Sequence, residues 1–171
     1  MRAIVEAAMP QTAIHAQVLA ARDGREPRVI ARLFSGWALF GERQFVRGYA
    51  LLLPDPVVPN LNALGVRDRS AFLTDMASLG DALLKATGAL RINYAMFGNE
   101  EPALHAHVIP RYLEEPARLR SAHPWAYDWE AAPAFERAAY EELAESLLRE
   151  LTRLGVTKQM RFAPGSRAAD P

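Results

Sequence analysis

The chain has 171 residues, half of them hydrophobic, and its 20 basic and 20 acidic side chains give a formal net charge of zero. A chain of this length can form one domain with a substantial core, and the lack of excess positive charge argues against a nucleic-acid-binding protein. The absence of cysteine excludes disulfides, thiolate nucleophiles and cysteine-ligated zinc. No apolar run reaches the ~20 residues of a membrane span, so we expect a cytoplasmic protein without a membrane partner.

The first part of the chain predicts one helix followed by three strands. The helix is expected over residues 12–22. Two short apolar runs, 28–34 and 37–40, flank a Ser-Gly pair, which is typical of a β-hairpin. Residues 45–53 end in an apolar run and predict a third, central strand, which Pro54 terminates.

The second part predicts two long helices around a pair of strands. The helices are expected over residues 70–87 and 134–154, and the strands over 90–97 and 102–111. On the first of these helices, the apolar residues that recur at helical spacing and predict a buried face are Phe72, Met76, Leu79 and Leu83. The segment 112–133 has no clear periodicity and predicts an ordered loop over the site or the sheet.

This order of elements predicts an α+β domain. Its sheet is expected to be mostly antiparallel and five-stranded, with a long helix packed on it and an additional C-terminal helix. We expect a single domain over residues 1–161. Residues 162–171 are rich in Pro, Gly, Ser and Arg and predict a flexible tail.

Residues 102–111 carry the clearest chemical signal, because they hold two of the four histidines. On a strand, His105 and His107 share one face, with their Cα atoms roughly 6–7 Å apart. The residues expected to point the other way, into a core, are Leu104, Ala106 and Val108. Two imidazoles on one face, followed by a proline and an arginine, indicate a site for a phosphate or a metal.

The residues alone leave three interpretations of this pair open. The histidines can be structural. They can be metal ligands, with Glu100 or Glu101 completing the site, because catalytic zinc usually takes three protein ligands. They can also act on phosphate, because a neutral imidazole is a good nucleophile toward phosphorus and the preceding turn 98–102 offers N–H groups to the developing charge.

The run Gly98-Asn99, followed by Pro-Ala-Leu-His-Ala-His-Val-Ile-Pro-Arg, resembles the histidine-triad (HIT) superfamily, whose motif is His-φ-His-φ-His-φ-φ. The resemblance covers roughly residues 28–112. The spacing is most similar to that of bacterial proteins described as diadenosine tetraphosphate hydrolase-like. It implies a HIT-like fold and a hydrolase that acts on nucleoside polyphosphates or related phosphoanhydrides.

The resemblance implies a role for each matching residue. His105 falls on the histidine that attacks the α-phosphate and becomes a nucleotidyl-histidine, and His107 falls on the last histidine, which contacts the phosphate or the bridging oxygen. Asn99, in the turn with Gly98, would hydrogen-bond the α-phosphate. Arg111 follows the Pro-Arg ending of the motif, with a structural role or an outer-phosphate role.

The sequence also departs from the family pattern. Ala103 stands where the first histidine of the triad is expected, although its backbone carbonyl can still orient the nucleophile. Glu42 is expected to replace the residue that usually holds the ribose. Gln44 and Arg47, near the same turn, are candidate phosphate or nucleotide contacts.

The resemblance further implies a nucleotide or dinucleoside polyphosphate as substrate, with Mg²⁺ accompanying the polyphosphate and no tightly bound cofactor or metal site. It implies a homodimer that uses the apolar stripe of the last helix or a strand edge. One alternative is a nucleotide-binding protein with little turnover, because Ala103 breaks the triad. Another is a metal-dependent hydrolase that uses the His-x-His pair as ligands. The segment 123–125 has two readings, as a packed loop or as a lid over the polyphosphate.

Overall fold

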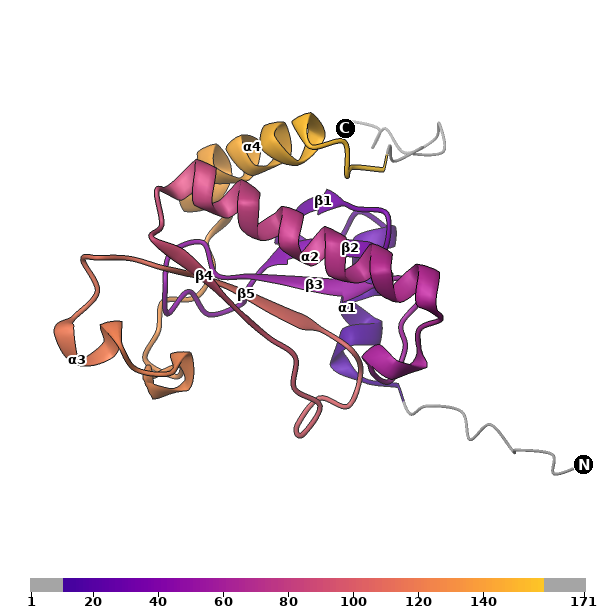
Figure 1. The fold of residues 1–171 in the computed structure, drawn as a ribbon, viewed down its shortest axis with the longest axis horizontal. Coiled ribbons are helices and arrows are strands. Elements are labelled where there is room, and N and C mark those ends of the chain that lie inside the picture. The colour runs from indigo at the N-terminus through magenta and orange to yellow at the C-terminus, as the bar shows by residue number, and fades with distance from the viewer. Residues whose placement is uncertain (1–10, 159–171) are drawn as a thin grey trace, which may run out of the picture.

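The centre of the fold is a five-stranded antiparallel sheet, with strand order β1-β2-β3-β5-β4 (Figure 1). The structure is a computed structural model, and it describes residues 11–158. Its strands are β1 (Val29–Arg32), β2 (Gly36–Phe40), β3 (Ala50–Pro54), β4 (Arg91–Ala95) and β5 (Ala106–Arg111). The predicted α+β class and antiparallel sheet are therefore confirmed. The predicted tail, 162–171, lies outside the described residues.

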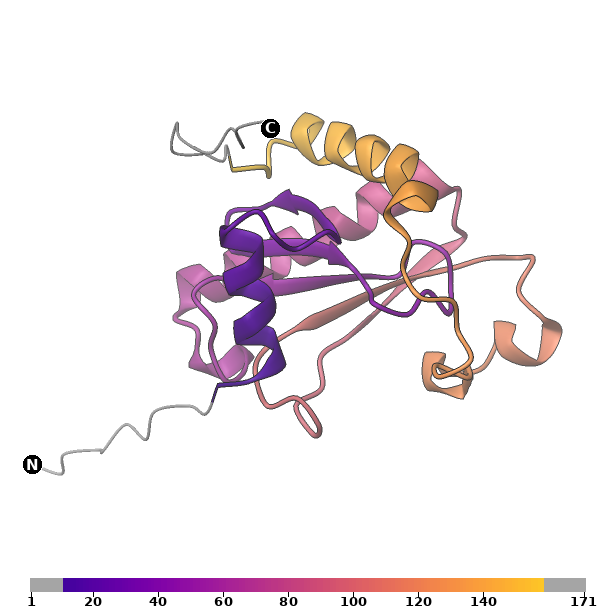
Figure 2. The ribbon, with the colours of Figure 1, turned by 180° about the vertical axis from the view of Figure 1, so that it is seen from behind.

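Helices cover the sheet on both faces (Figures 1 and 2). They are α1 (Ala13–Arg22), α2 (Val66–Thr87), the short α3 (Ala117–Arg120) and α4 (Arg137–Arg153), with 3-10 turns at Leu61–Ala63 and Pro124–Ala126. The long α2 and α4 share one face of the sheet, and α1 lies on the other. No helix within residues 11–158 is long and apolar enough to cross a membrane.

The alternation of side chains on β5 separates these two faces. Leu104, Ala106 and Val108 are buried in the cluster beneath α2 and α4, as predicted. Ile109 and Ala103 belong to the second cluster, beneath α1. The site described below therefore lies on the face that α1 covers only in part.

Two predicted strands begin later than expected. The histidine strand begins at Ala106 rather than at residue 102, because the Leu104 N–H donates to the Val58 carbonyl (2.8 Å) instead of to a strand neighbour. As a result, His105 lies in the extended segment that leads into β5. The third strand begins at Ala50 rather than at residue 45.

The apolar stripe of α4 is part of the core. Leu143, Leu147 and Leu151 are buried in the cluster that α4 forms with α2 and the sheet. The stripe is therefore not available as a dimer interface, which corrects that part of the prediction. Its heptad-like spacing arises because one narrow face of the helix packs against a neighbouring helix within the same chain.

Candidate active site

The two histidines of the motif open into one cavity of about 560 Å³, which we call the histidine cavity. The residues that line it come from the 97–101 turn, from the start of β5 and from the 123–129 segment: Phe97, Asn99, Glu100, Glu101, His105, His107, His123, Trp125 and Trp129. The cavity thus combines imidazoles, aromatic rings and carboxylates. Among residues 11–158, no three side chains of metal-ligating type come together at one point.

His105 is held by a backbone carbonyl. Its side chain is buried, with 8% of the residue exposed, and its Nδ1 lies 2.8 Å from the carbonyl oxygen of Ala103. Because a carbonyl can only accept, Nδ1 carries a hydrogen, and in the neutral ring the lone pair is therefore on Nε2. This is the tautomer that a nucleophilic imidazole requires, and it needs no third histidine side chain.

His107 is held by a side chain rather than by a backbone carbonyl, and this side chain, that of Tyr49, comes directly before β3. The hydroxyl of Tyr49 lies 2.6 Å from Nδ1 of His107. Burial raises the pKa of Tyr49 well above its usual value, so the phenol stays protonated. Burial, followed by the charge of His105, lowers the pKa of His107 to about 4, so this imidazole is neutral at pH 7. The phenol therefore donates to Nδ1, and the hydrogen of His107 sits on Nε2.

The two imidazoles are thus chemically complementary. Their ring centroids lie 4.9 Å apart and the rings are tilted by 70°. His105 offers a lone pair, whereas His107 offers an N–H donor. A nucleophile beside a neutral hydrogen-bond donor is suited to attack on a phosphorus whose oxygen the donor stabilises.

The turn before β5 is tied to α1. Glu101 accepts hydrogen bonds from the backbone N–H of Ala13 (3.1 Å) and of Ala103 (3.3 Å). A carboxylate at a helix N-terminus is favourable, since it meets unpaired N–H groups and the positive end of the helix dipole. The contact fixes the residue whose carbonyl orients His105. In the same turn, Asn99 lines the cavity, and Gly98 lines an adjacent hollow that His105 also borders.

Gln44 lies away from the cavity, which corrects its predicted role as a substrate contact. It is buried (6% exposed). Its Nε2 donates to the carbonyls of Gly41 (2.8 Å) and Tyr49 (2.9 Å), and its Oε1 accepts from Gly48 N–H (3.0 Å). The side chain therefore satisfies the backbone of the loop that delivers Tyr49. This loop, in which Gly48 has φ +85°, is also why β3 starts late.

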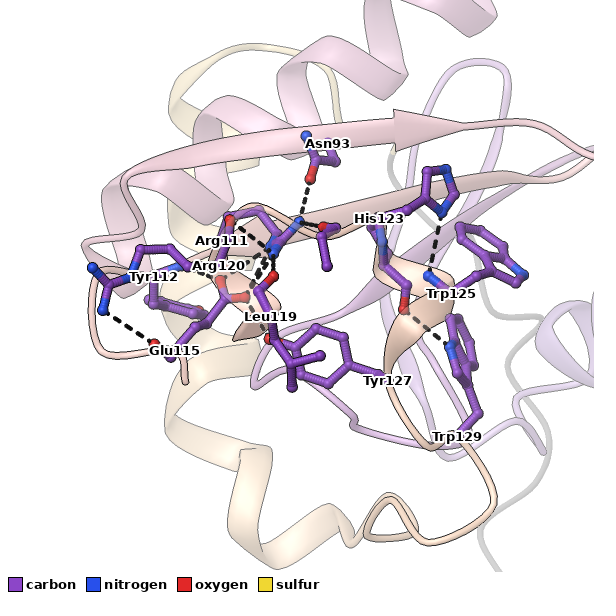
Figure 3. A network of polar contacts seen from close by, with 12 residues as sticks. Asn93, Arg111, Tyr112, Glu115, Leu119, Arg120, His123, Trp125, Tyr127 and Trp129 are labelled. Carbon is purple, nitrogen blue, oxygen red and sulfur yellow. Dashed lines mark hydrogen bonds and ion pairs between the residues drawn. The ribbon is translucent and has the colours of Figure 1, made fainter. Parts of the chain in front are cut away.

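Arg111 is likewise structural (Figure 3). It is 6% exposed and pairs with Glu115 at 2.8–3.1 Å. Its remaining N–H groups donate to Asn93 Oδ1 (2.9 Å) and to the carbonyls of Ala122 (3.1 Å) and Leu119 (2.7 Å). With every guanidinium nitrogen engaged, Arg111 has no donor left for a phosphate, so the outer-phosphate role is corrected in favour of the structural one.

The Arg111 network anchors the segment that covers the cavity. The hydroxyl of Tyr127 also donates to Glu115. Burial raises the pKa of Glu115, but the hydrogen bonds from Arg111 and Tyr127 lower it further than burial raises it. The pKa is therefore below its usual value, and the carboxylate stays ionised. This buried ion pair fastens the chain on either side of His123 and Trp125 to the sheet (Figure 3).

Glu42 and Arg47 are exposed and do not line the histidine cavity. Their backbone carbonyls accept hydrogen bonds from Phe135 N–H (2.8 Å) and from the Tyr112 hydroxyl (2.7 Å). The structure therefore does not bring these two predicted contacts to the histidines. No other residue of this turn lines the cavity.

Three aromatic residues of the site were not predicted from the sequence: Tyr49, Phe97 and Trp129. Trp129 packs against Trp125, with centroids 5.3 Å apart, and Trp125 in turn lies 5.2 Å from the ring of His107. In the sequence, the feature that could have indicated Trp129 is the concentration of aromatic residues over 125–129. Trp125 itself remains 43% exposed at the cavity mouth.

No protein-family model and no curated protein sequence matches the chain significantly. Among solved structures, a histidine triad protein from Marinobacter aquaeolei VT8 superposes with a TM-score of 0.66, at 18% identity over 85% of this chain and 99% of its own. The fold is shared. A histidine triad protein from Sinorhizobium meliloti 1021 gives 0.62, at 22% identity over 72% and 88%.

The chain has the fold of the histidine triad proteins. A hypothetical histidine triad nucleotide-binding protein from Sulfolobus tokodaii strain7 also superposes, with a TM-score of 0.64 at 15% identity, over 81% of this chain and 93% of its own. At such identities the likeness establishes the histidine-triad fold, as the motif predicted. The narrower resemblance to diadenosine tetraphosphate hydrolase-like proteins stays a prediction.

Proposed function

We propose that this protein is a nucleotide hydrolase or nucleotidyl transferase in which His105 is the nucleophile. The observation that carries the proposal is the hydrogen bond from His105 Nδ1 to the Ala103 carbonyl, which leaves the Nε2 lone pair at the cavity. Ala103 thus supplies the orienting acceptor although it replaces the first histidine of the triad. The histidine-triad fold and the nucleotide-binding name of one similar protein agree with this function.

The reaction would proceed in two displacements. In the first, Nε2 of His105 attacks the α-phosphorus, the bond to the leaving phosphate or amine breaks, and the leaving group departs with the electron pair; an amine takes up a proton from solvent as it leaves. The nucleotidyl-imidazolium keeps its Nδ1 hydrogen bond to Ala103, while the Nε2–H of His107 donates to a phosphoryl oxygen. In the second, water or another acceptor attacks phosphorus, loses its proton to solvent and releases neutral His105.

The substrate we propose is a dinucleoside polyphosphate, with diadenosine tetraphosphate as the first choice on the resemblance of the motif. Mg²⁺ would accompany its phosphates as part of the substrate. The exposed ring of Trp125, together with Phe97 at 4.9 Å, provides a surface on which a base can stack. Asn99 is the candidate amide donor to the α-phosphate.

One observation favours a second function, nucleotide binding with little turnover. The side chain of Ala103 is buried under α1 (1% exposed), so no imidazole reaches the leaving group from that position. Mass spectrometry of protein quenched during incubation with diadenosine tetraphosphate, or with a nucleoside phosphoramidate, separates the two functions. We expect a nucleotidyl mass on the peptide that carries His105. Tight nucleotide binding without any adduct or product would leave only the binding function.

We also propose a homodimer in which two sheets join at a strand edge. The outer edge of β1 is partly paired, because Leu33 bridges Thr157 and the Lys158 N–H donates to the Arg32 carbonyl (2.8 Å). The opposite edge strand is β4. Light scattering after gel filtration should give twice the 18.9 kDa of one chain, and a monomer mass at micromolar concentration would refute the dimer.

A further inference from the structure

A second hollow, of about 640 Å³, lies beside the histidine cavity on the same face of the sheet. It extends along β4 and the end of β5 and is closed by residues 120–125. His123 and Trp125 line both hollows, so the two are neighbours across these side chains. The basic residues that line it, and after which we name it the arginine hollow, are Arg91, Arg111 and Arg120.

The two hollows carry opposite charge. The described lining of the histidine cavity holds Glu100 and Glu101 and no arginine or lysine, whereas that of the arginine hollow holds no carboxylate. Arg111 is neutralised by its buried ion pair. Arg91 and Arg120 form no ion pair with the described residues, so their charges remain available to a ligand.

The neutral polar groups of the arginine hollow are oriented as donors. Asn93 Oδ1 accepts from Arg111 (2.9 Å), and only the oxygen of the amide can do so, which leaves the amide N–H₂ group for the hollow (Figure 3). His123 Nδ1 accepts from the backbone N–H of Trp125 (3.3 Å), which places the ring hydrogen of His123 on Nε2. A surface of N–H donors with uncompensated arginine charge is suited to an anion.

The strand register gives the distance of the arginine hollow from His107, the proposed donor beside the nucleophile. Ala95 pairs with His107, and Asn93 and Arg91 follow at two and four residues along β4. At about 3.3 Å per residue, they lie roughly 7 and 13 Å along the strand from the level of His107. A single extended ligand can therefore place one phosphate at His105 and a further anionic group in the arginine hollow.

We propose that the arginine hollow is a subsite for a second phosphate of the substrate, held by Arg91 with the amide of Asn93. This inference rests on the proposed function, because it states how the proposed substrate is oriented in the site. The anionic chain runs along β5 toward Arg91, and the uncharged nucleoside next to the scissile phosphate lies toward the aromatic rings and Glu100. A substrate with one phosphate would leave the subsite empty.

Calorimetric titration of the full chain with inorganic tripolyphosphate tests the subsite without turnover. Arg91→Glu should weaken binding about tenfold or more, because it removes a charge-assisted contact and adds a like charge. The matched control is Arg118→Glu, an exposed arginine of α3 that lines neither hollow; it should change binding less than about twofold. Equal effects of the two variants, or no effect of Arg91→Glu, would overturn the subsite.

A kinetic comparison separates the failure of this inference from the failure of the proposed function. Arg91→Glu should raise KM for diadenosine tetraphosphate about tenfold and have a clearly smaller effect on KM for a nucleoside phosphoramidate, which has one phosphate, whereas Arg118→Glu should change neither value by more than about twofold. An adduct on His105 with tripolyphosphate binding insensitive to Arg91 would refute only the subsite. Binding that depends on Arg91, without any adduct on His105, would refute only the proposed hydrolase.

Discussion

The histidine cavity and the arginine hollow share one face of the sheet but are built in opposite ways. In the cavity, His105 and His107 are largely buried, and each has one ring nitrogen committed to a protein partner. In the hollow, exposed arginine side chains lie above a buried ion pair whose donors are all engaged. Buried imidazoles with fixed tautomers are suited to forming a bond to phosphorus, whereas exposed arginine charges are suited to binding an anionic group. The position of a polar residue relative to the motif therefore does not by itself reveal which of the two tasks it serves.

The strongest way to break this comparison is to remove the nucleophile. His105→Asn should lower turnover by about a thousandfold or more, because the other two imidazoles that line the cavity, those of His107 and His123, use their lone pairs as hydrogen-bond acceptors. Nucleotide affinity should stay within about threefold, since binding depends on the surrounding rings and donors. Initial rates and calorimetric titrations measure the two quantities. Turnover that survives in His105→Asn would assign the chemistry elsewhere.

The next effect concerns the anchor beneath the arginine hollow. Glu115→Gln should lower the free energy of unfolding by about 3–5 kcal/mol, because Arg111 keeps its charge in a buried position without its partner. The double variant Arg111→Leu with Glu115→Leu should lose less, since no charge remains buried. Urea unfolding followed by tryptophan fluorescence measures both. A loss below 1 kcal/mol in Glu115→Gln would mean that the pair does not hold the segment.

Tyr49→Phe sharpens the contrast between the two histidines. The ring keeps its packing, but His107 loses the donor that fixes its tautomer. We expect kcat to fall about 10- to 100-fold with little change in KM, because an N–H donor to the transition state is no longer secured. Tyr140→Phe is the matched control, since the ring of that tyrosine packs against Phe40 and Phe135 and lines neither hollow. Similar losses in both variants would argue against a positioning role for Tyr49.

The last effect concerns stability against acid and is spread over more than two pH units. In the native protein, burial lowers the pKa of His107 from 6.5 to about 4, so the unfolded chain binds a proton first as the pH falls. Stability should therefore decrease between about pH 6.5 and pH 4, by about 3 kcal/mol at most, and this contribution should not change further below pH 4. Denaturation curves of wild type and His107→Gln measure the difference. A slope that is equal in both proteins would contradict the assignment.

The parts of this structure that the sequence predicted are those governed by local periodicity. The alternation around His105 and the stripe on α2 follow directly from strand and helix geometry. The roles of Gln44 and Arg111 do not, because a polar side chain beside a motif looks the same whether it meets a ligand or its own backbone. Tyr49 lies 58 residues from His107, and only the pairing of β3 with β5 brings them together.

The hydrogen bond that orients His105 cannot be removed by exchanging the amino acid that provides its acceptor. Its acceptor is the main-chain carbonyl of residue 103, which every amino acid carries. Alanine scanning and natural variation at this position leave the acceptor in place, so neither can expose its contribution. An amide-to-ester exchange of the bond between residues 103 and 104, introduced by chemical synthesis, would weaken the carbonyl as an acceptor. Because the exchange also removes the Leu104 N–H that donates to Val58, its effect sets an upper limit on this contribution.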